Sequence, residues 1–326
     1  MQAFQYASPK TVQEALEHLS STWGEADILA GGTDLLSLMK ERVHEPKKVV
    51  GLRGIKELHG ISKAGSGLRI GAMVTVQELA DNKQIQKAYP ALVQAAEGIT
   101  SPQMRSMGTV VGDLLQRPRC WYFRGGMGLL AQEASGKSLI PNGENRYHAI
   151  LGNKGPAYFV NASSFAPAMI ALGAKVKVVS KGGSREVEVE KLYRMPAGQS
   201  ERELDLKPDE LVTEIVLPAA SARSATYEVR ERQLLDWPLT AAAVSLEMSG
   251  NTVKSARVVL GHVAPTPWRS SQAEQALAGK AVSEEVAAAA GKAAVAAATP
   301  LSQNKYKVQL ASVAVKRAVL AAAGRA

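Results

Sequence analysis

Two glycines and a threonine lie where an apolar segment of the chain gives way to an amphipathic one. In the stretch ILAGGTDLLSLMK, Gly31, Gly32 and Thr33 separate residues typical of a strand from residues typical of a helix. Glycines let consecutive backbone N–H groups converge, and no Cβ blocks the approach of a ligand. The start of the following helix adds positive potential that suits an anion such as a pyrophosphate. Thr33 can donate a hydroxyl hydrogen bond, whereas Asp34 is expected to cap its helix. An ordinary turn explains the same residues, so this stretch alone does not decide between the two.

A second stretch, SPQMRSMGTVVGDLLQ, has a similar character. It places Gly108-Thr109 and Gly112-Asp113 in another glycine-punctuated turn, with Arg105 just before it. A dinucleotide pyrophosphate carries several oxygens, which two separate backbone nests can hold from two sides. Neither stretch has the GxGxxG spacing after a first strand, so a Rossmann site is not indicated.

Other residue types that carry chemistry form no recognised pattern. The single cysteine, Cys120, excludes a disulfide within the chain and a metal site made only of its own cysteines. Ser163 and Ser164 lack the context of a nucleophile elbow. No HxH or HExxH spacing occurs among the five histidines, His18, His44, His59, His148 and His262. We therefore expect no metal site and no catalytic nucleophile or base on this chain.

The composition is that of a globular protein with two or three packed units. Of the 326 residues, 46% are hydrophobic and 21% charged, and the formal net charge is +9. An anionic cofactor or an acidic partner explains this surplus as well as nucleic acid does, and the scattered basic residues disfavour nucleic acid. No apolar run is long enough to span a bilayer, and the N-terminus lacks the features of a signal peptide. The cytoplasm is the expected compartment.

The N-terminal third alternates helix and strand signals, which predicts an α+β unit. Strands are expected at 26–32, 47–52 and 68–74. Capping boxes at Thr11–Glu14 and Thr75–Glu78 each predict a helix start. Further helices are expected at 34–41 and 89–99, the second closed by Gly98.

The pattern weakens between 114 and 158, which is rich in Gly, Pro, Asn and Arg. A stretch of this length without regular elements is often functional. A helix and a strand follow within 167–180.

The C-terminal part is predicted to contain strands followed by helices. A strand at 209–217 is stopped by Pro218, and 219–225 is a linker. Strands at 226–232, 240–248 and 252–263 follow, with a tight hairpin at Ser249-Gly250-Asn251. Alanine-rich helices are expected at 283–298 and 303–323.

These stretches together resemble a known family. LAGGTDLLSLMK and PQMRSMGTVVGDL resemble the paired FAD-binding motifs of the flavoprotein (medium) subunits of molybdenum hydroxylases. That family includes xanthine dehydrogenase, carbon monoxide dehydrogenase and 4-hydroxybenzoyl-CoA reductase. DELVTEIVLP, YEVRERQLLDWPLTAAAV and VVLGHVAPTPWRS also resemble that subunit, in the same order. The resemblance covers nearly the whole chain.

The resemblance implies an α+β fold. A two-part FAD-binding domain of the vanillyl-alcohol-oxidase-like (PCMH-type) class would occupy 1–218, with subparts at about 1–55 and 56–218 and an insertion at 114–158. An α+β C-terminal domain would occupy 222–326. FAD would lie extended between the parts, with its pyrophosphate near 30–35 and 109–113. The implied cofactor-binding residues are Leu29, Ala30, Gly31, Gly32, Thr33, Asp34, Leu35, Arg105, Thr109, Val110, Val111, Gly112, Asp113, Ser164 and either Leu211 or its neighbour Val212.

Three departures from the family pattern have expected consequences. Val111 stands where the family usually has glycine, and a β-branched residue resists positive φ, so the nest geometry is expected to differ. Ser164 replaces the usual aspartate, which removes an acceptor for a cofactor hydroxyl. The insertion resembles those that carry a [4Fe–4S] cluster on four cysteines, but Cys120 alone cannot hold that cluster. We therefore expect the insertion without the cluster and Cys120 as a buried or idle thiol.

Side chains near these motifs have two interpretations each. Trp121, Tyr122 and Phe123 either stack on a flavin or line a subunit interface, or they simply pack the inserted loop. Arg230, Arg232 and Asp236 either make a polar contact near the flavin or, as the residues favour, lie on an exposed strand face.

The function implied by the resemblance is electron transfer. A small partner subunit would carry two [2Fe–2S] clusters and a large one molybdopterin. Electrons would pass through the FAD of this chain to NAD+, oxygen or a quinone, and no membrane or nucleic acid would be involved. Val111 and Ser164 leave open a scaffold subunit that has lost FAD. A stand-alone flavin oxidoreductase is disfavoured because the chain offers no convincing substrate base.

Overall fold

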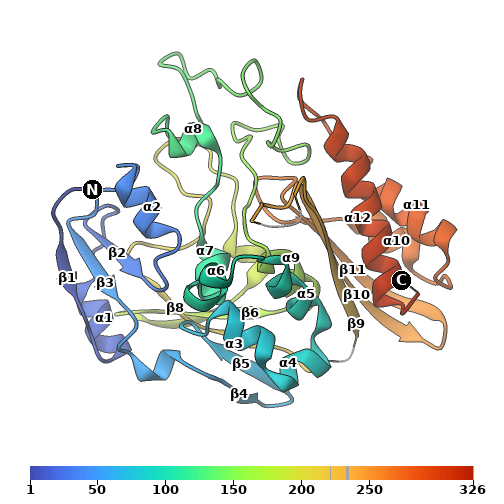
Figure 1. Ribbon diagram of the computed structural model, residues 1–326, viewed down its shortest axis with the longest axis horizontal. Helices are drawn as coiled ribbons and strands as arrows, with labels where there is room; N and C mark the ends of the chain where they lie inside the picture. The colour runs from blue at the N-terminus through green and yellow to red at the C-terminus, as the bar shows by residue number, and fades with distance from the viewer. Residues whose placement is uncertain (221, 233–234, 326) are drawn as a thin grey trace.

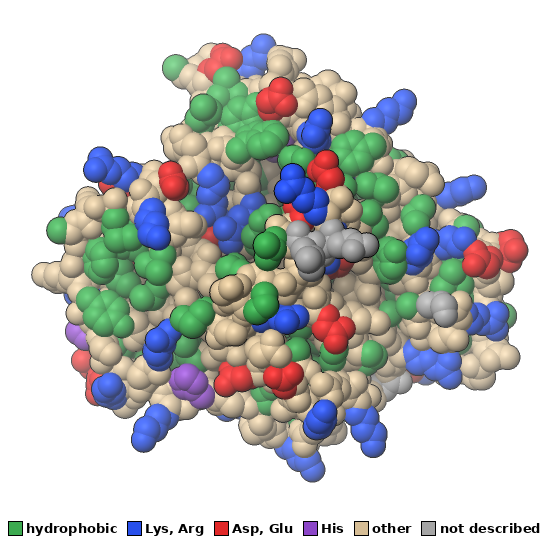
Figure 2. Space-filling model, viewed as in Figure 1, with side chains coloured by type: hydrophobic (Ala, Val, Ile, Leu, Met, Phe, Trp, Pro, Cys, Tyr) green, Lys and Arg blue, Asp and Glu red, His purple; other side chains and the backbone are tan. Residues whose placement is uncertain are grey.

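The computed structural model describes residues 1–220, 222–232 and 235–325 and contains three sheets (Figure 1). Residue 221 of the predicted linker at 219–225 lies outside the described residues. So do residues 233 and 234 of the motif YEVRERQLLDWPLTAAAV, which spans 227–244. The overall class is α+β, as predicted. In the described ranges no helix is long and apolar enough to cross a membrane. Lys and Arg side chains are spread over the visible face and do not gather into one patch (Figure 2).

The first sheet is small and parallel. Its strand order is β1-β3-β2, made of β1 (Gln5–Ala7), β3 (Lys48–Gly51) and β2 (Ala26–Leu29), with helices α1 (Val12–His18) and α2 (Leu35–Lys40) between the strands in sequence. Thr11 caps α1 as predicted, because its side chain accepts from the backbone N–H of Glu14. The return half of that capping box is shifted by one residue, since the Glu14 carboxylate accepts from the N–H of Lys10.

The second sheet is antiparallel, with the order β4-β5-β8-β6-β7. Its strands are β4 (Ile61–Ala64), β5 (Gly67–Gly71), β6 (Lys175–Ser180), β7 (Gly183–Glu188) and β8 (Leu211–Leu217). The complete capping box predicted at Thr75 and Glu78 is present. The helices of this part are α3 (Val76–Asp81), α4 (Lys83–Ala88), α5 (Pro90–Gly98), α6 (Pro102–Met107), α7 (Val110–Leu115) and α9 (Phe165–Ala171), with 3-10 turns η1 (Lys56–Leu58) and η2 (Val189–Leu192).

The insertion rises above these two sheets (Figure 1). Between α7 and α9, where every residue is described, the only helix is α8 (Trp121–Arg124) and no strand is formed. A small core that includes Phe123, Leu130, Ile140 and Phe159, together with Leu38 of α2, holds the segment together. The weak sequence pattern therefore marks an irregular but packed segment.

The third sheet has the order β12-β11-β10-β9 and lies between two groups of helices (Figure 1). Alternate residues of β10 and β11 face opposite cores. Ala243 and Val259 join the core of the second sheet, whereas Val244 and Val258 join the C-terminal core. The predicted hairpin is present, with Gly250 at φ +58° between the paired Ser249 and Thr252. The elements are β9 (Arg223–Val229), β10 (Thr240–Ser249), β11 (Thr252–Gly261), β12 (Trp268–Arg269), α10 (Ser271–Leu277), α11 (Glu284–Ala294) and α12 (Tyr306–Ala322).

Candidate functional site

The two glycine-bearing turns, which are far apart in the sequence, lie in direct contact. A Cβ added at Gly31 would overlap the carbonyl oxygen of Met107 and lie 2.7 Å from its carbonyl carbon. A Cβ added at Gly108 would lie 3.5 Å from the Thr33 hydroxyl. Glycine at position 31 is therefore what allows the two turns to touch.

The first turn presents free backbone donors. The N–H groups of Gly31, Gly32, Thr33 and Asp34 donate no hydrogen bond to any described residue. Gly32 has φ +78°, a left-handed conformation that favours glycine. Because buried or half-buried N–H groups normally find a partner, this row of donors is suited to an anionic ligand.

The second turn differs from its prediction in extent. Gly112 and Asp113 lie within the first turn of α7, and only Gly108 and Thr109 form the turn between α6 and α7. The Thr109 hydroxyl caps α7 by accepting from the Gly112 N–H at 3.0 Å. Val111 is helical and 5% exposed, so this position requires no positive φ. The expected conflict between a β-branched residue and the local geometry is therefore wrong.

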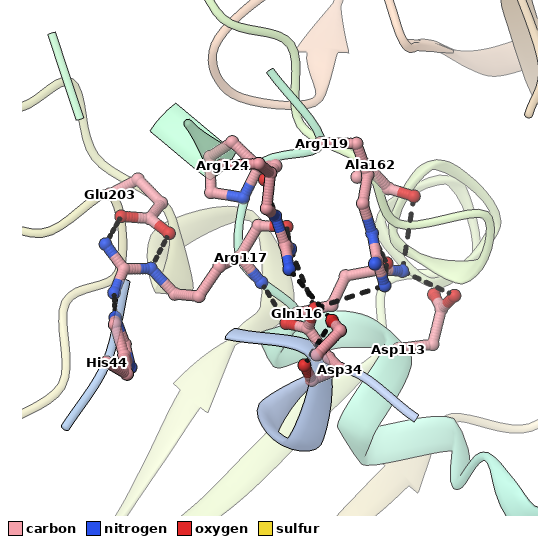
Figure 3. A network of polar contacts seen from close by, with 11 residues as sticks. Asp34, His44, Asp113, Gln116, Arg117, Arg119, Arg124, Ala162 and Glu203 are labelled. Atoms are coloured by element: carbon pink, nitrogen blue, oxygen red, sulfur yellow. Dashed lines mark hydrogen bonds and ion pairs between the residues drawn. The ribbon is translucent and has the colours of Figure 1, made fainter. Parts of the chain in front are cut away.

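Asp34 does not cap its helix. Although it occupies the position before α2, its side chain makes no capping hydrogen bond. Its carboxylate instead accepts from the Arg117 N–H at 2.8 Å and from Arg124 Nη2 at 2.7 Å, and it lies 3.2 Å from Arg119 Nη2 (Figure 3). Three arginines of the insertion thus converge on one carboxylate, because the tertiary fold brings the insertion over α2.

Two clefts lie on either side of the paired turns. The first cleft extends from the turns toward β2 and the start of β8, and the second cleft extends toward α5, α6 and residues 235–238. Their common wall consists of Thr33, Asp34, Thr109, Gly112 and Gln116. The two clefts therefore adjoin each other, with the paired turns between them.

Most residues predicted from the sequence line these clefts. Ser164 and Asp113 line the second cleft. The first cleft is lined by Ala30, Gly31, Gly32, Thr33, Asp34, Leu35, Thr109, Val111, Gly112, Leu211 and Val212. Three predicted residues line neither cleft. Val110 is fully buried in the main core, Leu29 ends β2, and Arg105 lies on α6.

Several polar and aromatic side chains of the first cleft were not predicted from the sequence. The Arg202 guanidinium lies 3.6 Å from the centre of the Trp23 ring. Burial and the nearby charge of Arg117 lower the pKa of Arg202 to about 10, so it remains a cation at neutral pH. His44 contacts Arg117 Nη1 at 2.8 Å through Nε2, and its Nδ1 lies 3.4 Å from Asp27. No local motif marks these residues, because they come from separate loops.

Two buried carboxyl groups lie behind the second cleft. Asp113 accepts from Ser163 Oγ at 2.5 Å and from the Phe165 N–H at 3.1 Å, and burial raises its pKa to about 6. Burial, helped by the charge of Asp113, raises the pKa of Glu228 to about 7, although the charge of its ion-pair partner Arg230 lowers it. Ser164 lies close to Glu228 and lowers the pKa of its carboxyl. An aspartate at 164 would add a third acidic group beside Asp113 and Glu228. A neutral serine avoids this additional repulsion.

Replacing Glu228 with glutamine is expected to flatten the pH dependence of stability. The carboxyl has a pKa of 4.5 when unperturbed and about 7 when folded, so its stabilising effect is present below pH 4.5 and is lost as the pH rises through 7. A pKa difference of one unit corresponds to about 1.4 kcal/mol, so the unfolding free energy of the wild type should fall by about 3 kcal/mol across this pH window. Glu228→Gln should not show this fall. Urea unfolding at pH 5 and pH 8 measures the difference, and the exposed Glu17→Gln serves as control. An unchanged slope in Glu228→Gln would contradict the expectation.

The structure shows where the aromatic side chains of the insertion and Arg230 lie. Phe123 lies in the core of the insertion and Tyr122 Oη accepts from the Glu144 N–H, which favours packing of the loop for both. Trp121 is 43% exposed. Arg230 does not lie on an exposed strand face, because it forms the buried ion pair with Glu228.

Cys120 is buried beside a histidine, with Sγ 3.2 Å from His148 Nε2. Burial raises the pKa of its thiol. Among the described residues, no group of three or more His, Cys, Asp or Glu side chains is arranged to hold a metal ion.

Two known protein families match this chain. Residues 2–220 match the model of the FAD-binding domain in molybdopterin dehydrogenase, and residues 225–322 match the CO dehydrogenase flavoprotein C-terminal domain. The chain belongs to this flavoprotein family. It is an oxidoreductase subunit of the molybdenum hydroxylase family with FAD as its cofactor, as the sequence motifs predicted.

Relatives cover almost the full length of this flavoprotein. The carbon monoxide dehydrogenase medium chain of Hydrogenophaga pseudoflava is 31% identical over 91% of this chain and 88% of that protein. The aldehyde oxidoreductase FAD-binding subunit of Escherichia coli is 31% identical over 95% of each. A solved structure of Cu,Mo-CO dehydrogenase superposes with a TM-score of 0.78 at 27% identity, covering 100% of this chain and 99% of that one.

Proposed function

We propose that this flavoprotein is the medium subunit of a three-part molybdenum hydroxylase complex. A small subunit with [2Fe–2S] clusters would deliver electrons, and a large subunit would hold molybdopterin. FAD on this chain would pass the electrons to a terminal acceptor. The complex would act in the cytoplasm, and the FAD-binding and C-terminal domains would occupy 1–218 and 222–326.

The observation that carries the proposal is the pair of touching turns with a cleft on each side. Free N–H donors at 31–34 would bind the diphosphate of FAD at the common wall of the clefts. The two ends of the cofactor would then extend into the two clefts. Trp23 and Arg202 in the first cleft are suited to a nucleobase, because aromatic and guanidinium groups both stack on planar rings. The residues present therefore fit an extended dinucleotide.

The chain's own contribution is to bind and orient the cofactor, because a bound flavin supplies the redox chemistry itself. The apolar second cleft, backed by the acids Asp113 and Glu228, would surround the remaining part of FAD. A scaffold that has lost FAD is not favoured. Val111 fits the helix α7 without strain, and Ser164 adds no acidic group beside Asp113 and Glu228, so neither residue argues against a bound cofactor.

The proposal predicts that the purified full-length chain is yellow and holds one FAD but no iron. Released flavin is quantified after denaturation, and the emptied protein is titrated with FAD while flavin fluorescence is followed. Metal analysis of the same sample checks for iron. A colourless chain that does not bind added FAD would overturn the proposal.

A further inference from the structure

Arg119 of the insertion has one side-chain nitrogen that is not used inside the protein. Its Nε and Nη2 both donate to Oε1 of Gln116, at 3.2 Å and 3.0 Å, and Nη2 also lies 3.2 Å from Asp34 Oδ1 (Figure 3). Within the described ranges Nη1 donates to no residue, and it is not one of the buried polar atoms that lack a partner. Because the side chain is 23% exposed, this donor is open to a ligand.

The two neighbouring arginines have no unused nitrogen. Arg117 uses Nε and Nη2 for Glu203 and Nη1 for His44. Arg124 uses Nε and Nη1 for a backbone carbonyl and a serine hydroxyl, and it uses Nη2 for Asp34. Of the three arginines that converge on this carboxylate, Arg119 is therefore the one that can bind a further group.

Arg119 borders the common wall of the two clefts. Two residues of that wall, Asp34 and Gln116, are its polar partners. The side chain lines the second cleft and also a third cavity, whose walls include His148 and His262. A group bound at the common wall would therefore lie next to the free donor of Arg119.

The contacts of Arg119 fix its orientation. The central carbon of its guanidinium lies 4.6 Å from the centre of the Trp237 ring. Gln116 is itself held, because its Nε2 donates to Asp113 Oδ2 at 2.9 Å and to the Ala162 carbonyl at 3.2 Å. Stacking uses the face of a guanidinium, whereas its N–H groups donate in its plane. The contact with Trp237 therefore leaves Nη1 available.

The charges around Arg119 favour an anion. Its guanidinium and that of Arg124 both face the Asp34 carboxylate, at 3.2 Å and 2.7 Å, so the second cation exceeds what this carboxylate requires. The other nearby acid, Asp113, accepts from Ser163 and from a backbone N–H instead. Burial lowers the pKa of Arg119. A bound anion would offset this effect, because it stabilises the charged form of the guanidinium.

We propose that Arg119 binds the diphosphate of FAD through its free Nη1, together with the backbone N–H groups of residues 31–34. Hydrogen bonds between a guanidinium and a phosphate are short and charge-assisted, so they add both affinity and orientation. The inference rests on the proposed function for the identity of the cofactor. It gives the insertion a part in cofactor binding, through a side chain that belongs to neither glycine-bearing turn.

The test compares two ligands, FAD and inorganic pyrophosphate, on the full-length chain freed of flavin. Flavin fluorescence and calorimetry give their affinities at low and at high salt. Arg119→Gln should weaken both about tenfold at low salt, the effect of one lost hydrogen bond to a charged group. The deficit should shrink at high salt, because salt screens partly exposed charges. Arg223→Gln, an exposed arginine outside the clefts, is the matched control and should bind as the wild type does.

A second pair of variants separates direct binding from an effect through Asp34. Asp34→Asn removes the charge that Arg119 faces but keeps an oxygen that can accept from the Arg117 N–H. In this background Arg119→Gln should still weaken both ligands about tenfold, since the contact with the diphosphate is lost in the same way. Arg119→Lys keeps the charge without the planar set of donors, so its affinity should fall between those of the wild type and Arg119→Gln.

Three results would overturn the inference: wild-type affinity in Arg119→Gln, the same deficit at low and high salt, or no effect of Arg119→Gln in the Asp34→Asn background. Circular dichroism checks the fold of each variant. If Arg119→Gln does not fold, wild-type affinity in Arg119→Lys overturns the inference instead. FAD binding that does not depend on Arg119 defeats only this inference. Pyrophosphate binding that depends on Arg119, in a wild type that does not bind FAD, defeats the proposed function and leaves the anion site in place. Binding of neither ligand defeats both.

Discussion

Gly31→Ala is expected to separate the two turns and to abolish tight FAD binding. The added methyl would overlap the backbone carbonyl of Met107, and backbone cannot rotate away as a flexible side chain can. The turns must move apart, which disrupts the common wall of the two clefts. We expect a loss of about 3 kcal/mol in unfolding free energy, the upper range for overpacking. We also expect FAD affinity to fall by about a hundredfold or more, since about 1.4 kcal/mol corresponds to a factor of ten.

Urea unfolding and FAD titration measure the two effects of Gly31→Ala. Gly198→Ala is the matched control, because no atom lies within 4 Å of its added Cβ and its φ is not positive. This control should keep wild-type stability and FAD affinity. Wild-type FAD affinity in Gly31→Ala would show that the contact between the turns is not needed for the cofactor.

Glu203→Gln is expected to destabilise the base of the insertion by about 3 kcal/mol, because it leaves a buried guanidinium without its counter-charge. Arg117 binds Glu203 through two contacts, Nε to Oε1 at 2.5 Å and Nη2 to Oε2 at 3.1 Å (Figure 3). The side chains are only 10% and 3% exposed. Arg117 lines the first cleft and its backbone N–H binds Asp34 at the common wall. FAD affinity should therefore fall together with stability.

The control for Glu203→Gln is an exposed ion pair of the same chain. Glu25 and Lys47 are 43% and 73% exposed at 2.9 Å, and such pairs contribute about 0–1 kcal/mol. Glu25→Gln should leave both the urea midpoint and the FAD titration close to the wild type. Equal effects of the two substitutions would mean that the buried pair does not anchor the insertion.

Local sequence signals predicted most of the regular elements. The capping box at Thr75, the hairpin at Gly250 and the stop of β8 before Pro218 each depend on a few neighbouring residues, and each is present. Two of the missed strands lack such signals. The strand β7 is a mostly exposed edge with no apolar alternation, and β1 is only three residues long.

The role of Asp34 illustrates where local reasoning fails. A residue before a helix is by statistics a cap, but three arginines from more than eighty residues away take its carboxylate. Val111 shows the same limit, since only the observed helix α7 removes the need for positive φ. Such competition between local and distant partners is decided by tertiary contacts.

The sequence by itself determined the family, the cofactor and the two glycine-bearing turns, because these depend on residue types at short spacing. Only the tertiary structure decided that the turns touch, that Glu228 joins Asp113 behind the second cleft, and that His148 and His262 share one cavity. Those pairs are separated by tens to more than a hundred residues, and their side chains gain or lose partners through burial. Burial and partner choice arise when the three sheets and the insertion pack together, and no local spacing encodes them.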